Sequence, residues 1–464
     1  MSKNNFVHAR SCDSMIANGN ATVTGNIIYA KNSDRPLNEA QPLIYYPPAD
    51  HADGEMVRTS FIEIPQVQHT YGVLGSKLET FFGFEHGINE WGLAIGNEQT
   101  SGREIPEHKW GLIGMDILRL TLERSQNARE AIDCITDLLE KYGTGGDPAV
   151  RIPYFNTNLI IADPDECFVF ESHQRDWVVK KVETTAVIGN CYSLQDYDMI
   201  SDHAVQNAVE NGWWAEGKPF NPARAWTPDD HKWDEDEGFV RFGRIKELMT
   251  RHDKYSLEMM MSNLRDHYDD VPSLQTIFSP AMSKIGTVCC HPGGLDGCIT
   301  SASMVAEIRK DAPKELRFTA WTSMAPPCCS IFRPIYNTGN LPANLSGAGK
   351  LYDKNENWWT FIELERYLSL CFEKWAPRVK ADFAAMEREF IDEAAYIEKK
   401  YNGDVSVLDE FSARTVKYSY DLARTQIERI KSSLRTIDID RMALEYFTKT
   451  CDGCGMPYDK DVIK

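Results

Sequence analysis

The sequence predicts a mixed α/β fold of the α+β kind, in which a β-rich core carries a helical region at its C-terminal end. Two observations predict it. Short runs of β-branched and aromatic residues, separated by turn residues, fill the chain up to about residue 100 and return between residues 159 and 189. Between residues 112 and 142, and again after residue 351, apolar residues instead recur at helical spacing. Helices that follow a set of strands are expected to pack as a layer on the sheet that these strands form.

The first predicted element is a β-hairpin. Residues 14–17 and 25–30 are predicted strands, and Asn18, Gly19 and Asn20 between them are turn residues. Such a hairpin brings Cys12 and the segment 31–35 together at one end.

The remaining elements follow in chain order. Strands are predicted at 43–46, 61–64, 70–75 and 92–96 and, after two helices within 112–142, at 159–162, 167–171, 177–182 and 186–189. A further helix begins near residue 237, and helices at 358–370, 379–396 and 411–434 carry apolar stripes that serve as packing faces. The tryptophan-rich segment 212–233 either covers a substrate entrance or is anchored in the core.

Composition excludes several classes of partner. A hydrophobic content of 42% and a mean hydropathy of −0.42 are typical of a soluble globular protein, and no apolar run approaches the length of a membrane span. A net charge of −19 argues against nucleic acid or an anionic membrane as partner, since both require basic patches. Twelve cysteines without a secretory signal predict free thiols in a reducing compartment, the cytoplasm.

Cys12 is the candidate nucleophile because of its position. Residues 1–11 are polar and too short for a secretory signal, so we expect them to be removed at the Ser11–Cys12 bond. Cys12 would then carry a free α-amine with a pKa of about 8, which can accept the thiol proton without a histidine. Asp34 can accept a hydrogen bond from that amine. The alternative is that Cys12 is an ordinary buried thiol beside a tail.

Several motifs resemble a known family. They are SCDSM at 11–15, GNIIYAKNSDRP at 25–36, GINEWGLAIGNE at 87–98, TVCCH at 287–291, TSASMV at 300–305 and PCCSIF at 327–332. The chain resembles the secernins, within the cysteine dipeptidase family of N-terminal nucleophile hydrolases. The resemblance implies a four-layer αββα fold over residues 12–340, with residues 1–11 as a propeptide and residues 351–464 as a helical region packed on the core or forming an oligomer interface.

The resemblance also implies roles for individual residues. Asn97 and Asn190 match asparagines that stabilise the oxyanion, and Arg241 is similar in placement to an active-site arginine. Taken alone, the two asparagines would be turn or loop residues, and a helical arginine is usually solvated. Lys31 and Asn32 are expected beside the substrate. In more distant relatives an arginine stands at the position of Lys31; either residue can lower a thiol pKa, but they differ in geometry and charge.

The function expected from these features is hydrolysis of small amides, most directly of dipeptides. No cofactor is needed, since nucleophile and base are both protein groups. Two alternatives stay open: a non-catalytic regulatory protein linked to secretion, and an acylase acting on N-acyl amides. The expected partner is a small peptide or amide, and self-association into a homo-oligomer is also open.

The other cysteines do not predict a metal site. Cys289-Cys290 and Cys328-Cys329, with His291, invite a metal interpretation, but zinc ligands are usually spaced by two to four residues. Cys451 and Cys454 have that spacing. We interpret them as reduced surface cysteines on a glycine-containing turn, with zinc or redox chemistry as the alternative.

Overall fold

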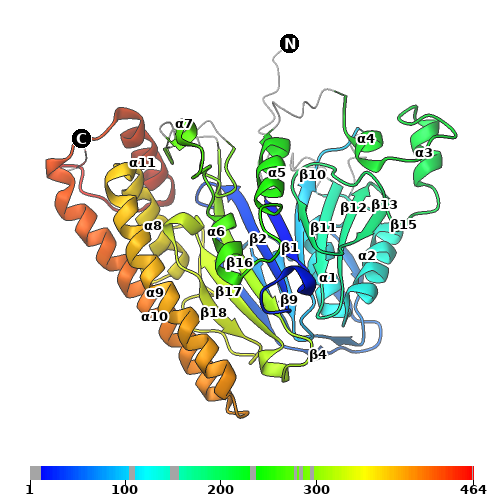
Figure 1. The fold of residues 1–464 in the computed structure, drawn as a ribbon, viewed down its shortest axis with the longest axis horizontal. Coiled ribbons are helices and arrows are strands. Elements are labelled where there is room, and N and C mark those ends of the chain that lie inside the picture. Colours follow the sequence, from blue (N-terminus) through cyan, green and yellow to red (C-terminus); the bar gives the residue numbers. More distant parts are fainter. Residues whose placement is uncertain are drawn as a thin grey trace.

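The architecture consists of two β-sheets between two sets of helices. The computed structural model describes residues 12–103, 110–146, 156–229, 237–275, 279–281, 286–292, 297–461 and 463, so the predicted propeptide 1–11 lies outside the described residues. In Figure 1 the sheets lie side by side at the centre, with helices on both outer faces. This is the four-layer αββα arrangement that the family resemblance implies.

The first sheet has six antiparallel strands in the order β14-β1-β2-β16-β17-β18. Their bounds are Thr185–Ile188, Asp13–Ala17, Ile27–Pro36, Cys298–Ile308, Phe318–Met324 and Arg333–Tyr336. Strands β1 and β2 form the predicted hairpin, and Asp13 faces Asn32 in its register. Strand β2 extends beyond the prediction to Pro36 because β16 pairs with it along its full length.

The second sheet has eight antiparallel strands in the order β15-β13-β12-β11-β10-β9-β8-β3. Their bounds are Met199–Ile200, Asp176–Lys181, Cys167–His173, Asn156–Ala162, Ala94–Thr100, Phe84–Asn89, Val73–Lys77 and Leu43–Tyr46. The described residues also form two short two-stranded ribbons. In one, β4 (Ala49–Asp50) pairs with β7 (His69–Thr70), and in the other, β5 (Met56–Arg58) pairs with β6 (Glu63–Pro65).

Helices α1 (Gly114–Arg124) and α2 (Ala128–Tyr142) cover the eight-stranded sheet and share its apolar core. Asn127 caps α2 by accepting hydrogen bonds from two backbone amides of its first turn, and Gly143, with a φ of 65°, ends it. Helices α3 (Ala204–Glu210) and α4 (Pro222–Trp226) pack beside β13 and β15, where Trp226 is fully buried. Trp226 is thus anchored in the core; residues 230–233 of that segment are outside the described residues.

The helices that cover the six-stranded sheet come from two parts of the chain. Helices α5 (Glu237–Leu248) and α6 (Leu257–Leu264) pack near β1, β2 and β14, and the short α7 spans Pro272–Gln275. Helices α8 (Asn357–Ser369), α9 (Phe372–Lys400), α10 (Val405–Ser433) and α11 (Arg441–Cys454) form the C-terminal layer. All residues of α8 are buried, and it belongs to the same apolar cluster as the sheet. The C-terminal helices are therefore continuous with the core.

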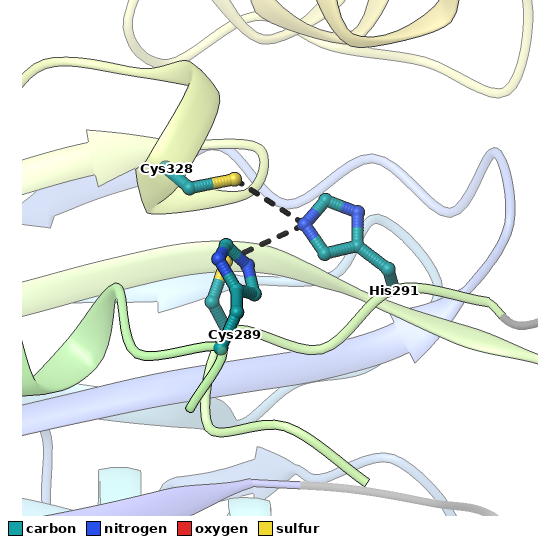
Figure 2. A group of neighbouring side chains, drawn as sticks. Cys289, His291 and Cys328 are labelled. Carbon is teal, nitrogen blue, oxygen red and sulfur yellow. Dashed lines mark hydrogen bonds between the residues drawn. The ribbon is translucent and has the colours of Figure 1, made fainter. Parts of the chain in front are cut away.

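The cysteines differ from the prediction in two respects. Cys451 and Cys454 end α11 and are buried, not at the surface, because the last turn of that helix packs into the core beside Phe447. Cys328 comes close to the segment of Cys289 and His291, with its Sγ 3.3 Å from Nε2 of His291 (Figure 2).

Among the described residues, no helix has both the length and the hydropathy needed to cross a bilayer.

Candidate active site

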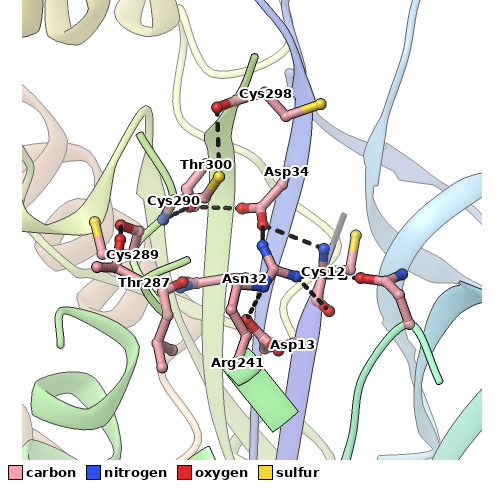
Figure 3. A network of polar contacts seen from close by, with 12 residues as sticks. Cys12, Asp13, Asn32, Asp34, Arg241, Thr287, Cys289, Cys290, Cys298 and Thr300 are labelled. Atoms are coloured by element: carbon pink, nitrogen blue, oxygen red, sulfur yellow. Dashed lines mark hydrogen bonds and ion pairs between the residues drawn. The ribbon is translucent and has the colours of Figure 1, made fainter. Parts of the chain in front are cut away.

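Cys12 lies immediately before β1, and its backbone nitrogen donates a hydrogen bond to Oδ2 of Asp34 at 3.2 Å (Figure 3). The β1–β2 register produces this contact and confirms the predicted meeting of Cys12 with the 31–35 segment. The backbone of Cys12 is left-handed, with a φ of 62°, a conformation that costs a non-glycine residue energy and often marks a functional site. Its side chain is 2% exposed.

Asp34 is held by two further contacts, one from each of two other elements. Arg241, on α5, donates from Nη1 to Oδ2 of Asp34 at 2.6 Å, and Thr300, on β16, donates from Oγ1 to Oδ1 at 2.6 Å. The same guanidinium donates from Nη2 to the carbonyl oxygen of Cys12 at 3.2 Å and to Oδ1 of Asn190 at 3.1 Å. Arg241 is 1% exposed, so it is a buried part of this network and not a solvated helical arginine.

The sulfur of Cys12 faces the second sheet. Its Sγ lies 3.9 Å from Oε2 of Glu85, a buried carboxylate on β9 whose Oε1 accepts from Nη1 of Arg35 at 2.9 Å. The side-chain amide of Asn97 is oriented so that its oxygen does not face other acceptors. In this orientation its nitrogen donates to the carbonyl oxygen of Glu85 at 2.8 Å and to Oε2 of Glu85 at 3.2 Å. The thiol, a carboxylate and a side-chain amide therefore meet at one point between the sheets.

A buried ion pair joins the two sheets beside this point. Lys31, on β2, donates from Nζ to Oε1 of Glu98 at 2.9 Å and to the carbonyl oxygen of Asn97 at 2.7 Å. Ser14 donates to the same Glu98 oxygen at 2.6 Å. Gly96 allows the sheets to come this close, because a Cβ there would lie 2.8 Å from Cδ of Lys31. The lysine that the sequence places beside the substrate is fully buried and supports the strand of Asn97.

Asn32 and Asn190 also have internal partners. Asn32 donates from Nδ2 to the carbonyl oxygens of Leu264 and Val288, at 2.9 and 2.8 Å, and is fully buried. Asn190 follows β14 and donates from Nδ2 to the carbonyl oxygen of Gln99 at 2.8 Å. In this conformation Asn32 supports neighbouring segments, and Asn190 holds the guanidinium of Arg241.

Burial controls the charge of the nucleophile. Burial raises the pKa of the Cys12 thiol to about 12, although the nearby Lys31 ammonium acts to lower it. Burial likewise raises the pKa of Asp13 from 3.8 to about 7, against the lowering influence of Arg241, whose Nε lies 3.4 Å from Oδ2. With its α-nitrogen still in an amide bond, Cys12 is a neutral thiol at neutral pH and needs a base.

Sequence analysis missed three residues of the site: Glu85, Glu98 and Thr300 had been given no role. Glu85 lies on a strand that was not predicted, and all three reach the site through contacts between strands far apart in sequence. Asn97 was expected just after a strand, but it lies inside β10, which continues to Thr100 by pairing with β11.

Comparison with known proteins bears on the same residues. Residues 11–237 match Peptidase family C69, a match that begins directly before Cys12 and ends just short of Arg241. This match supports the cysteine dipeptidase family. A probable dipeptidase from Latilactobacillus sakei is 22% identical over 240 residues, which make up 49% of this chain and 48% of that protein. The chain thus spans about half the length of the curated relative that it matches.

Solved structures are similar only at a distance. Two mutant forms of conjugated bile acid hydrolase from Clostridium perfringens align with TM-scores of 0.37 and 0.38 at 14% identity, covering 73% of this chain and 95% of theirs. The N-acylethanolamine-hydrolyzing acid amidase ortholog of Caenorhabditis elegans aligns with a TM-score of 0.31 at 13% identity, covering 63% of this chain and 92% of its own.

Proposed function

We propose that the protein is a cysteine hydrolase of the secernin subfamily that cleaves small amides, most directly dipeptides. Residues 1–11 are its propeptide, residues 12–340 its catalytic domain, and Cys12 its N-terminal nucleophile. Residues 351–464 cover the core. The match to Peptidase family C69 and the similarity to a probable dipeptidase support a hydrolase of this kind.

The observation that carries the proposal is the contact between the Cys12 nitrogen and Asp34. Cleavage at Ser11–Cys12 turns this nitrogen into an α-amine attached to the residue that bears the thiol. A carboxylate that already accepts from the nitrogen can hold the amine in place. Arg241 and Thr300 hold that carboxylate in turn, so the base is positioned before substrate arrives.

The chemical steps then use groups at hand. The α-amine accepts the thiol proton, and the sulfur of Cys12 attacks the substrate carbonyl carbon to form a tetrahedral oxyanion. The ammonium returns its proton to the leaving amine as the C–N bond breaks, which leaves a thioester. A water molecule, losing its proton to the amine, attacks the thioester, and the acid product leaves as the thiol is restored. Asn97 is assigned to the oxyanion because its amide lies beside Glu85, the carboxylate that faces the sulfur of Cys12. Asn190 is assigned a supporting role, because it accepts from Arg241, which holds Asp34.

The charge around Cys12 favours a dipeptide over an N-acyl amino acid. Five carboxyl groups and three cations are linked by contacts around the thiol: Asp13, Asp34, Glu39, Glu85 and Glu98 with Lys31, Arg35 and Arg241. The summed charge of these groups is negative even when Asp13 is protonated. A free α-ammonium on the substrate is attracted by this negative charge, whereas an acylated amine carries no positive charge.

The test compares wild type with Cys12→Ala on matched panels of dipeptides and N-acyl amino acids. We expect wild type to hydrolyse dipeptides preferentially and Cys12→Ala to fall to background, while Cys134→Ala, which changes a half-buried cysteine on α2, keeps wild-type rates. Dipeptide hydrolysis by Cys12→Ala at the wild-type rate would refute the mechanism. Preference for N-acyl amino acids would keep the nucleophile and refute the substrate class.

A further inference from the structure

A second group of reactive side chains comes from segments that follow α6, precede β16 and follow β17. His267, Cys289, His291 and Cys328 are all buried, and each offers one ligand atom such that the four atoms lie within 4.8 Å of one another. Neither the chemistry at Cys12 nor the match to a peptidase family gives these residues a role. Two imidazoles and two thiols at one buried point form a set that soft divalent metals prefer.

We propose that these four residues bind one zinc ion as a structural Cys₂His₂ site. The proposal rests on the four side chains themselves and does not depend on the activity proposed for Cys12. A site with four protein ligands has no open position for water or substrate, so the ion stabilises the fold and takes no part in hydrolysis.

The distances fit a tetrahedral ion. Nε2 of His291 lies 3.3 Å from Sγ of Cys328 and 3.7 Å from Sγ of Cys289, and both sulfurs face this one nitrogen (Figure 2). Tetrahedral zinc, with Zn–S near 2.3 Å and Zn–N near 2.1 Å, places a nitrogen and a sulfur ligand about 3.6 Å apart. His267 completes the set, and its ring centroid is 5.2 Å from that of His291. Small side-chain movements bring all four atoms to coordination distance.

The surroundings of His291 fit a zinc ligand as well. Its Nδ1 lies 4.0 Å from Oε1 of Glu365, a fully buried carboxylate on α8. A metal-binding histidine commonly directs its second nitrogen to a carboxylate, which fixes the ring and strengthens the ligand. His291 thus directs one nitrogen to the sulfurs and the other toward a carboxylate.

The ion would tie together three segments that are distant in sequence. His267 follows α6, Cys289 and His291 precede β16, and Cys328 lies in the short 3₁₀ helix Pro327–Cys329 that follows β17. Joining these segments closes long loops. This stabilises the fold because it reduces the conformational entropy of the unfolded chain. Sequence analysis rejected a metal here because it considered only ligands close together in the chain.

The same segment supports the candidate active site. The backbone nitrogen of Cys290 donates to Oγ1 of Thr300 at 2.9 Å, and Thr300 in turn donates to Asp34 (Figure 3). Asn32 donates to the carbonyl oxygen of Val288 at 2.8 Å. An ion bound at Cys289 and His291 would hold this segment and, through it, the carboxylate beside Cys12.

The direct test is the metal content of the full-length protein, purified under reducing conditions without chelator. We expect close to one zinc per chain by elemental analysis. Replacement of zinc by Co²⁺ should give the visible bands of a tetrahedral ion and the near-ultraviolet charge-transfer band of cobalt–thiolate bonds. Both readouts use the wild-type chain, so they do not depend on a variant that folds poorly.

Variants identify the ligands. Cys328→Ser and His267→Ala should each lose the zinc retained after dialysis and weaken the cobalt–thiolate band. Cys290→Ser is the matched control, because Cys290 is buried beside Cys289 but is not among the four residues, and it should retain the ion. Wild type without stoichiometric zinc, or equal zinc in Cys328→Ser and wild type, would overturn the proposal; the second outcome would place the ion on other cysteines.

Discussion

The backbone nitrogen of Cys12 and Oδ2 of Asp34 face each other across two antiparallel strands at 3.2 Å. Because β1 and β2 are joined by a short connection, the contact is set by local hairpin geometry. Further contacts from α5 and β16 then fix the carboxylate. The thiol of Cys12, the backbone nitrogen of the same residue and a held carboxylate thus meet in one place, and this is the basis of the proposed mechanism.

The role of Thr300 gives a first prediction. Thr300→Val removes the hydroxyl that donates to Oδ1 of Asp34 but keeps the shape of the side chain. Loss of a hydrogen bond to a charged group costs about 1.5–3 kcal/mol, so kcat/KM should fall by roughly 10- to 100-fold. Thr300→Ser should restore the rate. Equal activity of the valine and serine variants would show that this contact does not position the base.

The ion pair between Lys31 and Glu98 predicts strong coupling in stability. Lys31→Met leaves a buried carboxylate without its cation, which should cost about 3–5 kcal/mol in the free energy of unfolding. Combining it with Glu98→Leu should cost less than the sum of the two single changes, with a coupling energy of roughly 1–3 kcal/mol. Urea denaturation of the four proteins measures this cycle, and strict additivity would contradict it.

The raised pKa of Cys12 predicts how its reactivity depends on pH. With its folded pKa at about 12, the thiol of a chain that retains residues 1–11 is protonated at neutral pH. Only the thiolate is alkylated, so the rate of iodoacetamide labelling should be slow at pH 7 and rise about tenfold per pH unit up to pH 9. Mass spectrometry of the Cys12 peptide follows this rate, with the half-buried Cys371 as internal comparison. Fast, pH-independent labelling would contradict the buried thiol.

The docking of α9 predicts a selective loss of stability. Glu387 accepts from both terminal nitrogens of Arg265, at 2.8 and 2.7 Å, and from the backbone nitrogen of Phe332 at 2.8 Å. Glu387→Gln weakens these charged contacts and should lower the free energy of unfolding by about 2 kcal/mol. Glu389→Gln, two residues along on the exposed face of the same helix, should have little effect. Equal unfolding midpoints for the two variants would show that this contact does not hold the helix.

Sequence reasoning found the parts of the site that depend on local structure. Turn residues at Asn18 and Gly19 predicted the hairpin and thereby the meeting of Cys12 with Asp34, which the structure confirms. Glu85 and Thr300 could not be found in this way, because they reach the site through packing between sheets and pairing of β16 with β2. Such contacts leave no local pattern in the chain.

The same distinction holds for the fold. Apolar stripes predicted the C-terminal helices, but α8 is buried on every side, including Glu363 and Glu365. Helical periodicity shows only one apolar face, so it could not reveal that polar partners from α10 and α11 cover the other. Glu363 accepts from Lys431 at 2.9 Å, and Glu365 accepts from Oη of Tyr446 at 3.2 Å.

The central claim is tested most directly by the intact mass of the protein isolated from cells, with mapping of its N-terminal peptide. A chain that begins at Cys12 is the predicted result, because the α-amine made by that cleavage is the base of the proposed mechanism. A chain that retains residues 1–11 and still hydrolyses dipeptides would contradict the account, since the nitrogen facing Asp34 would then be an amide that cannot accept a proton.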